Sequence, residues 1–427
     1  MSTVPGSSAP LPPEVTHADV IEPKPTTPWT PMVPHRRAVA VLVALSMGGF
    51  LFVTNEIAPY GLIKLMAADL GRTESEIGLL VTGFALVIVA ASVPLAVFTR
   101  RIPRRYLLTG ALVAYAVGGV LVATSSNMGG LLAGRLVQAL GQAMFWAVVN
   151  STAVALFPPQ IRGKIIARVL IGSSAAGVVG LPSITRLGQL TEWQMPFWIL
   201  AGVGTLLAAV YFLLIPTSKP DEGSGARGSD PHRRRFVAVL IVVSLSAGST
   251  AITYTYITPF LVDVTGIGQT VVPTVLLVGG AFSLLGTLVV GRFLDRYPVR
   301  TVAVALVMLL GVWGALWAGG ATVWVAVGVV LVQGFAWSLF VAAGNNRIMR
   351  HAPGSTDIGI ATNASMYNTG TAVGSLIGAG ILADAGAELL PLASLAGVML
   401  AGAVLALEWR SLRAGVRAPR TRRLISR

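Results

Sequence analysis

The chain has 427 residues, of which 54% are hydrophobic and only 11% are charged, and its formal net charge is +14. A soluble domain carries about 25% charged residues, so this composition excludes an ordinary soluble globular protein. There is no cysteine, which excludes disulfides, thiolate metal sites and a cysteine nucleophile. The four histidines, His17, His35, His232 and His351, do not have the spacing of a metal site.

Twelve long apolar runs, separated by short loops, occupy most of the chain. Runs of about 18 or more apolar residues predict membrane-spanning helices. In chain order we place them near Val39–Ile63, Ile77–Phe98, Tyr106–Thr124, Met128–Leu156, Ile165–Thr185, Met195–Ile215, Phe236–Leu261, Val271–Arg292, Thr301–Ala318, Thr322–Gly344, Ile358–Ala383 and Leu389–Leu407. This predicts an all-α, multi-pass membrane protein with twelve transmembrane helices. The sequence has no GKS/T phosphate loop and no nucleophile constellation, so we expect neither an enzyme nor an ATP-driven pump.

The loops carry nearly all of the Lys and Arg, and they alternate in a way that fixes a topology. If the N-terminus is cytoplasmic, only Lys64, Arg72 and Arg186 fall outside the cell, and Arg135 falls within a span. The positive-inside rule therefore predicts that both termini are cytoplasmic. We therefore expect the Lys and Arg residues to set the orientation of the chain in the membrane. Their expected partner is anionic lipid on the cytoplasmic leaflet rather than nucleic acid.

The chain divides into two similar halves. We expect a disordered Pro-rich cytoplasmic tail at residues 1–37, a six-helix bundle at 38–216, a cytoplasmic linker at 217–235, a second six-helix bundle at 236–408 and a basic cytoplasmic tail at 409–427. Short motifs recur between the halves in the same order. Leu136-Val137-Gln138 returns as Leu331-Val332-Gln333, and Pro59 matches Pro259. Duplication of a six-helix unit explains this pattern.

The loop between the eighth and ninth spans, Gly291 to Arg300, resembles the G-x-x-x-D-R-x-G-x-R loop of the major facilitator superfamily. Asn55–Gly61, Gly180–Pro182, Tyr256–Phe260 and Tyr367–Gly370 are similar to segments of bacterial sugar-efflux permeases and chloramphenicol-resistance exporters in its drug:proton antiporter group. The resemblance implies two pseudo-symmetric six-helix bundles that rock about a substrate site near the midplane. It also implies a monomer in the bacterial cell membrane, which exports sugars or small neutral or amphipathic drugs. The proton motive force would drive export, without a cofactor.

Two sets of residues are candidates for conformational control. The first is Gly172, Gly177, Gly180 and Pro182 in the fifth span, whose spacing resembles the glycine-rich motif of the superfamily's antiporters and favours efflux over uptake. Ordinary small-residue packing is the alternative. The second is Gly291, Asp295, Arg296 and Arg300 in the loop described above. The equivalent loop of the first half departs from the pattern, because Ala96 replaces the Gly and Arg100 stands where the Asp belongs.

Glu56 in the first span and Arg135 in the fourth are ionisable residues at similar depth. From helix rise, they lie about 12 Å and about 10 Å below the same face of the membrane. Because charged residues within spans are costly, they usually face a cavity or a partner. We expect Glu56 and Arg135 to face one another or to share a water network. Rocking that changed their separation would let Glu56 take up a proton on one side and release it on the other. A static pair that fixes helix packing, or direct substrate contact, is the alternative.

Amide and aromatic side chains in several spans predict a polar cavity. The candidate substrate-binding residues are Tyr60, Gln138, Gln142, Trp146, Asn150, Tyr254, Tyr256, Gln333, Trp337, Asn345, Asn363, Tyr367 and Asn368. Amides beside aromatic faces suit neutral polyols or an amphipathic drug, although membrane helices also use Asn and Gln to bind one another. An uptake permease or facilitator on the same fold, and a receptor or scaffold that does not transport, remain alternatives. Asp263, Asp384 and Glu388 lie at the outer ends of spans, where we expect them to be solvated.

Overall fold

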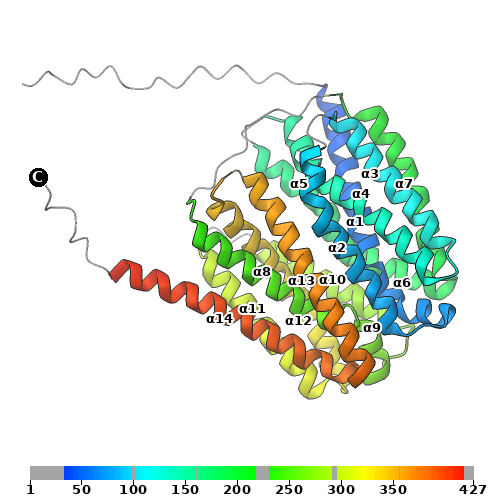
Figure 1. Cartoon of the computed structure of the whole chain (residues 1–427), viewed down its shortest axis with the longest axis vertical. Coiled ribbons are helices and arrows are strands. Elements are labelled where there is room, and N and C mark those ends of the chain that lie inside the picture. Colours follow the sequence, from blue (N-terminus) through cyan, green and yellow to red (C-terminus); the bar gives the residue numbers. More distant parts are fainter. Residues whose placement is uncertain are drawn as a thin grey trace, which may run out of the picture.

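The computed structural model describes residues 33–98, 102–158, 161–217, 230–290, 296–354 and 356–417, and within these ranges the chain is built from helices joined by short connections (Figure 1). The helices of the first half are α1 (His35–Leu70), α2 (Glu74–Phe98), α3 (Arg104–Ala123), α4 (Met128–Ala155), α5 (Arg162–Ala175), η4 (Ala176–Gly180), α6 (Leu181–Leu190) and α7 (Gln194–Leu214). Those of the second half are α8 (Arg233–Tyr254), α9 (Ile257–Pro259), η5 (Phe260–Val264), α10 (Val272–Val290), α11 (Pro298–Gly319), α12 (Val323–His351), α13 (Thr356–Ala385), η6 (Ala387–Leu389) and α14 (Leu390–Arg417).

The helices pack as two bundles. In the first half, α3 packs against α4 and α7, α1 against α5, and α2 against α4; in the second, α8 packs against α13 and α14, and α12 against α10 and α11. The bundles meet where α2 contacts α13, α1 contacts α9, and η4 and α6 contact α10. We call this boundary the seam. The predicted fold class, twelve transmembrane helices in two pseudo-symmetric bundles, is confirmed.

Eleven segments of the described chain are long and apolar enough to cross a membrane. The remaining expected span is α13, which has 30 residues and is therefore long enough, but which carries Asn363, Asn368 and several Thr and Ser residues. Its neighbours are α8 and α2. The helix with polar residues thus lies at the seam, where protein rather than lipid surrounds much of it.

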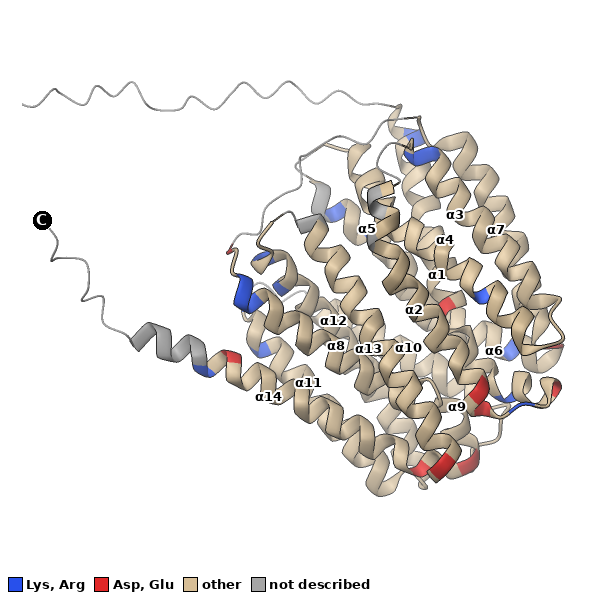
Figure 2. Cartoon of the chain, in the orientation of Figure 1, with Lys and Arg blue, Asp and Glu red and all other residues tan. Residues whose placement is uncertain are grey.

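Charge separates the two ends of the bundles (Figure 2). Lys and Arg gather at the end where α1 begins, which we call the Arg37 end, and Asp and Glu gather mainly at the end where α1 finishes, which we call the Lys64 end. This polarity is what the positive-inside rule uses. The assignment of the Arg37 end to the cytoplasm stays a prediction.

Several predicted boundaries differ from the observed ones. α12 continues past the expected Gly344 to His351, because the first helix-breaking residue is Pro353. α14 continues past Leu407 to Arg417, so part of the expected basic tail is helical. Most of the predicted N-terminal tail and linker, together with Gly291 and Asp295, lies outside the described residues.

The fifth transmembrane segment is one rod made of α5, η4 and α6. Pro182 has no N–H, so it cannot donate to the carbonyl four residues earlier, and the preceding turn is a π-helix in which the Leu181 N–H donates to the Ala176 oxygen. Gly172 lies in the same rod, where its N–H donates to Ser46 Oγ of α1 at 3.1 Å. A Cβ at Gly172 would overlap the Ser46 carbonyl oxygen. The two helices therefore touch backbone to backbone.

Gly172→Ala is expected to lower the free energy of unfolding in detergent by about 1–3 kcal/mol, because an added methyl forces α1 and α5 apart. The control is Gly311→Ala, since a Cβ at Gly311 would meet no described atom within 4 Å outside its own stretch of α11. Denaturant titration of both variants measures the difference. Equal stability of the two variants would contradict the packing described for Gly172.

Candidate functional site

Arg135 of α4 binds the backbone of α1 at a proline. Pro59 lies inside α1 and has no N–H, so the Asn55 carbonyl, four residues earlier, has no partner within the helix. The Arg135 Nη1 donates to that oxygen at 2.7 Å, and its Nη2 donates to the Glu56 oxygen at 3.2 Å. In a membrane no water is available to satisfy a freed carbonyl. The guanidinium therefore takes the place of the missing N–H and fixes α1 against α4.

The guanidinium of Arg135 is fully enclosed. Its exposed fraction is 0%, its Cζ lies 4.3 Å from the centre of the Phe84 ring of α2, and its Nη1 is 3.5 Å from Gln138 Oε1. Phe84 covers the cation with its ring face, an arrangement that stabilises a desolvated positive charge. Arg135 thus joins α1, α2 and α4.

The side chain of Glu56 makes a different contact. Its Oε2 accepts a hydrogen bond of 2.6 Å from Gln142 Nε2 of α4, and Glu56 is half-buried. Among the described residues, no ion pair within 4.0 Å joins the carboxylate to Arg135. The structure therefore brings Glu56 and Arg135 together through the α1 backbone, and gives the carboxylate an amide as its direct partner.

Aromatic residues from both bundles surround the Glu56 region. The rings of Tyr60 (α1) and Tyr254 (α8) meet edge to face across the seam at 5.9 Å, and those of Trp337 (α12) and Tyr367 (α13) lie 6.1 Å apart. Tyr367 lies near both Glu56 and Tyr60. We call these four residues the aromatic set. Tyr60 lies one turn from Glu56 on α1, so the set brings aromatic rings from both halves to this part of the seam.

Amides extend this region within the second half. The Asn363 Nδ2 donates to Asn345 Oδ1 at 2.8 Å, which joins α13 to α12. Both residues are half-buried. The Asn363 Oδ1 is enclosed and has no hydrogen-bond partner within the described part of the chain, so this amide retains an acceptor for a hydroxyl or amide donor.

The other candidates for substrate contact lie elsewhere. Gln138 packs against Gly118 and Gly119 of α3, inside the first bundle. Tyr256 is fully buried, and its hydroxyl donates to the Ser375 oxygen at 3.0 Å. The Asn368 Nδ2 donates to the Ala364 oxygen of its own helix.

Three further candidates also stand apart from the Glu56 contacts. Trp146 packs edge to face on Phe145, Asn150 lies one turn further along α4, and Gln333 is buried in α12. None of these three is among the residues described in contact with Glu56 or the aromatic set.

The conformational candidates are distributed over the seam and the Arg37 end. A Cβ at Gly180 would overlap Thr54 of α1, and the carbonyl oxygen of Gly177 lies 2.5 Å from where a Cβ of Gly280 in α10 would be. The rod formed by α5, η4 and α6 is therefore in close contact with α1 of its own bundle and with α10 of the second bundle. Arg296 and Arg300 are exposed and lie 5.4 Å and 5.1 Å from the centre of the Tyr297 ring.

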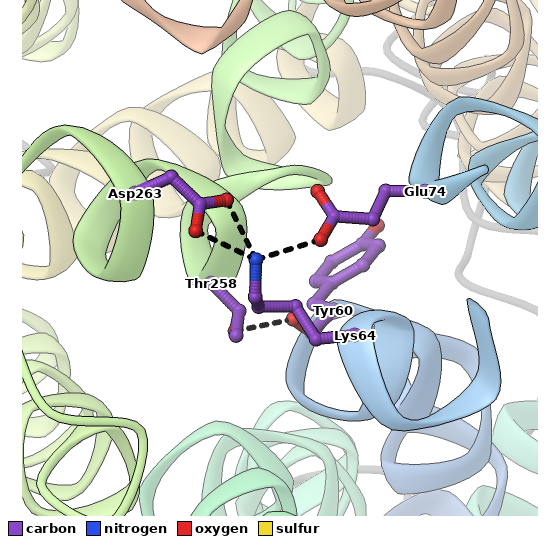
Figure 3. Close-up of polar contacts among 5 residues, drawn as sticks. All are labelled: Tyr60, Lys64, Glu74, Thr258 and Asp263. Atoms are coloured by element: carbon purple, nitrogen blue, oxygen red, sulfur yellow. Dashed lines mark hydrogen bonds and ion pairs between the residues drawn. The ribbon is translucent and has the colours of Figure 1, made fainter. Parts of the chain in front are cut away.

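Lys64 joins the two bundles at the end of the seam (Figure 3). Its Nζ lies 2.8 Å from Glu74 Oε1 in its own half and 2.6 Å from Asp263 Oδ2 in the other half. We call these three residues the Lys64 latch. Asp263, which we expected to be solvated, is half exposed but paired. Sequence reasoning missed the latch, although a lone Lys at the otherwise acidic end of a span was a sign of it.

Uncharged contacts close the same part of the seam. Beside the latch, the Thr258 Oγ1 donates to the Tyr60 oxygen at 2.7 Å (Figure 3). Ser75 of α2 donates to the Ala379 oxygen of α13 at 2.6 Å, and the Thr82 and Ser375 hydroxyls pair at 2.8 Å. The two halves are thus bonded together from the Lys64 end toward the level of the aromatic set.

A second feature that sequence reasoning missed is a buried ion pair between Arg347 of α12 and Glu408 of α14. The exposed fractions of these side chains are 1% and 5%. Because we expected both spans to end before these residues, both charges were placed outside the membrane-spanning helices. A Glu directly after an apolar run, in a chain with a basic end, was the available sign.

Comparisons with known proteins agree with this architecture. The profile of the Major Facilitator Superfamily matches residues 45–378. A probable sugar efflux transporter of Helicobacter acinonychis (strain Sheeba) is 27% identical over 356 residues, which cover 82% of this chain and 90% of that protein. One of Helicobacter pylori (strain J99 / ATCC 700824) is 26% identical and covers 83% and 91%.

Solved structures share the fold at lower sequence identity. A bacterial homolog of the human lysosomal transporter Spinster, crystallised in an inward-facing and unoccupied conformation, superposes with a TM-score of 0.69 and 16% identity, covering 90% of this chain and 99% of that one. The human organic anion transporter MFSD10 (TETRAN) gives a TM-score of 0.63 and 18% identity, covering 87% and 100%.

Because Arg135 donates to the carbonyl that Pro59 leaves free, the effects of Arg135→Met and Pro59→Ala on the free energy of unfolding are expected to be non-additive. Arg135→Met leaves that carbonyl without a donor, at a cost of about 1–3 kcal/mol. In a Pro59→Ala background, the new N–H at position 59 can donate to Asn55. We therefore expect the cost of Arg135→Met to be about 1 kcal/mol smaller there. Denaturant titrations of the four proteins in detergent measure this coupling, with Pro94→Ala as the control background. An equal cost in all backgrounds would show that Pro59 and Arg135 are independent.

The Lys64 latch predicts how the two halves separate. Asp263→Asn is expected to raise the population with the Lys64 end open by up to about fivefold, because a partly exposed ion pair contributes up to about 1 kcal/mol. Glu74→Gln is the matched control, since it removes a carboxylate from the same Lys without changing an inter-half bond. Spin labels on Ala68→Cys and Thr270→Cys report the distance, in a chain that has no other Cys. The latch has no role in closure if the two variants behave alike.

Proposed function

Because this chain belongs to the Major Facilitator Superfamily, we propose that this membrane transporter exports a small polar or amphipathic solute from a bacterial cell in exchange for protons. The observation that carries the proposal is the half-buried Glu56 carboxylate beside the seam. An ionisable residue inside a membrane protein is costly and is usually functional. In this proposal, movement of one half against the other changes the surroundings of Glu56.

The proposed substrates are sugars or small neutral or amphipathic drugs of the chloramphenicol type. The aromatic set and the Asn345–Asn363 pair support this class, because aromatic faces bind the apolar face of a ring while amides bind hydroxyl groups. The relatives named probable sugar efflux transporters support the sugar alternative and the direction of export.

In the proposed cycle, the Arg37 end is cytoplasmic and the Lys64 end is extracellular. The observed state, with the Lys64 latch formed, is then closed to the outside. When the latch opens, Glu56 takes up a proton from outside and the substrate leaves. When the opposite end opens, Glu56 releases the proton to the cytoplasm and a new substrate binds. The proton neutralises the carboxylate while the site is enclosed, which removes the cost of burying its charge.

In this proposal the membrane and the proton motive force supply the remaining requirements. The basic Arg37 end faces anionic lipids of the cytoplasmic leaflet. The transporter works as a monomer, since each chain contains both bundles and the seam between them. No cofactor takes part.

Export is tested in a drug-sensitive bacterial host by following the retention of chloramphenicol and of arabinose with and without a proton uncoupler. We expect the transporter to lower retention of at least one probe and the uncoupler to reverse this. Glu56→Gln is expected to abolish the uncoupler-sensitive part at unchanged membrane abundance, because an amide does not exchange a proton. Glu76→Gln, which changes a partly exposed carboxylate at the Lys64 end, serves as the control. Normal export by Glu56→Gln would refute the proposal.

A further inference from the structure

Gln142 is placed differently from the other amides of the region. It is 2% exposed, and its Nε2 donates to Glu56 Oε2 at 2.6 Å. Its other polar atom, Oε1, is enclosed and has no hydrogen-bond partner among the residues that the structure describes. One end of this amide is thus engaged by the carboxylate, and the other end is an unused acceptor in a buried place.

The two protonation states of a carboxyl group need opposite partners. A carboxylate only accepts hydrogen bonds, whereas a carboxylic acid also has an O–H to donate. A glutamine amide offers two N–H donors at one end and an acceptor oxygen at the other, and its terminal torsion is broad and roughly two-fold. A half-turn of the Gln142 amide therefore exchanges its donor for its free acceptor.

We propose that Gln142 is the positioning residue of the proton site, donating through Nε2 to the ionised Glu56 and accepting through Oε1 from the protonated Glu56. The carboxyl group then keeps one place and one partner through the whole cycle. This inference rests on the proposed function, because it assumes that Glu56 changes its protonation. It replaces the expected contact of Gln142 with the substrate.

The other groups near Glu56 do not supply this pair of contacts. Arg135 of α4 has donors only, and its Nη atoms bind the carbonyls of Asn55 and Glu56. Tyr60 of α1, Tyr254 of α8 and Tyr367 of α13 surround the site, but none of the hydrogen bonds described for this part of the chain joins their hydroxyls to the carboxylate. Gln142 is thus the described side chain that can serve both states.

The test is an infrared titration of the purified protein, which needs no knowledge of the substrate. The acid carbonyl band of Glu56 is identified by its loss in Glu56→Gln, and its amplitude is followed against pH. In Gln142→Met, a side chain of similar size without hydrogen-bonding groups, we expect the midpoint of this band to move to higher pH by about one to two units, because the carboxylate loses a donor. We also expect the band to move to higher frequency, because the acid loses its acceptor.

The matched control is Gln194→Met. The Gln194 amide also donates to a carboxylate, that of Asp69 at 3.2 Å, but at the Lys64 end of the bundle, so the Glu56 band should keep its midpoint and frequency. A second variant, Gln142→Glu, places two carboxyl groups in contact and should make the band titrate in two steps. This variant answers the question if the Met variant does not fold.

The outcomes separate this inference from the proposed function. If no band disappears in Glu56→Gln, Glu56 does not change its protonation and the proposed function fails. The role of Gln142 is overturned, while the proposed function stands, if the Glu56 band exists but Gln142→Met leaves its midpoint and frequency unchanged. The same conclusion follows if the band of Gln142→Glu still titrates in one step, as in the unmodified protein.

Discussion

The carbonyl oxygen that Pro59 leaves free in α1 is the constraint on which the site depends. A membrane offers no water to such a group, and the Arg135 guanidinium supplies the donor at 2.7 Å. Because the same guanidinium reaches the next carbonyl, that of Glu56, it sets where the Glu56 side chain leaves the helix. Arg135 thus acts through the backbone.

Two kinds of contact follow from this anchored helix. Toward the Lys64 end, α1 carries the Lys64 latch and the Tyr60 carbonyl, both bonded to the other half. One turn earlier, it carries Glu56, whose partner Gln142 lies in its own half. In the proposed cycle, the first bundle therefore moves past the second with the carboxyl–amide pair intact, while the bonds of the seam open and close. Glu56 and Lys64 lie on one helix, and in the proposed cycle this helix links the proton site to the latch.

Hydropathy predicted the twelve-helix fold from the sequence, because the thickness of a bilayer sets the length of its spans. It also identified Glu56 and Arg135, since charges are rare in spans. It did not predict which atoms they bind. The target of Arg135 is a main-chain oxygen, and its only sign was the spacing of four residues from Asn55 to Pro59. The partners of the latch, Lys64 and Asp263, are 199 residues apart. Arg347 and Glu408 were missed because helix ends were placed where the apolar runs finish, although helices continue into charged residues.

In the proposed cycle, protonation of Glu56 and separation of the halves are one linked equilibrium. This linkage can be measured with spin labels on Ala68→Cys and Thr270→Cys, read by pulsed electron paramagnetic resonance across a range of pH in lipid. We expect the ratio of the long to the short distance to change with pH in the otherwise unmodified protein and to be independent of pH when Glu56→Gln is added. A Glu56→Gln protein whose distances followed the same pH curve would contradict it.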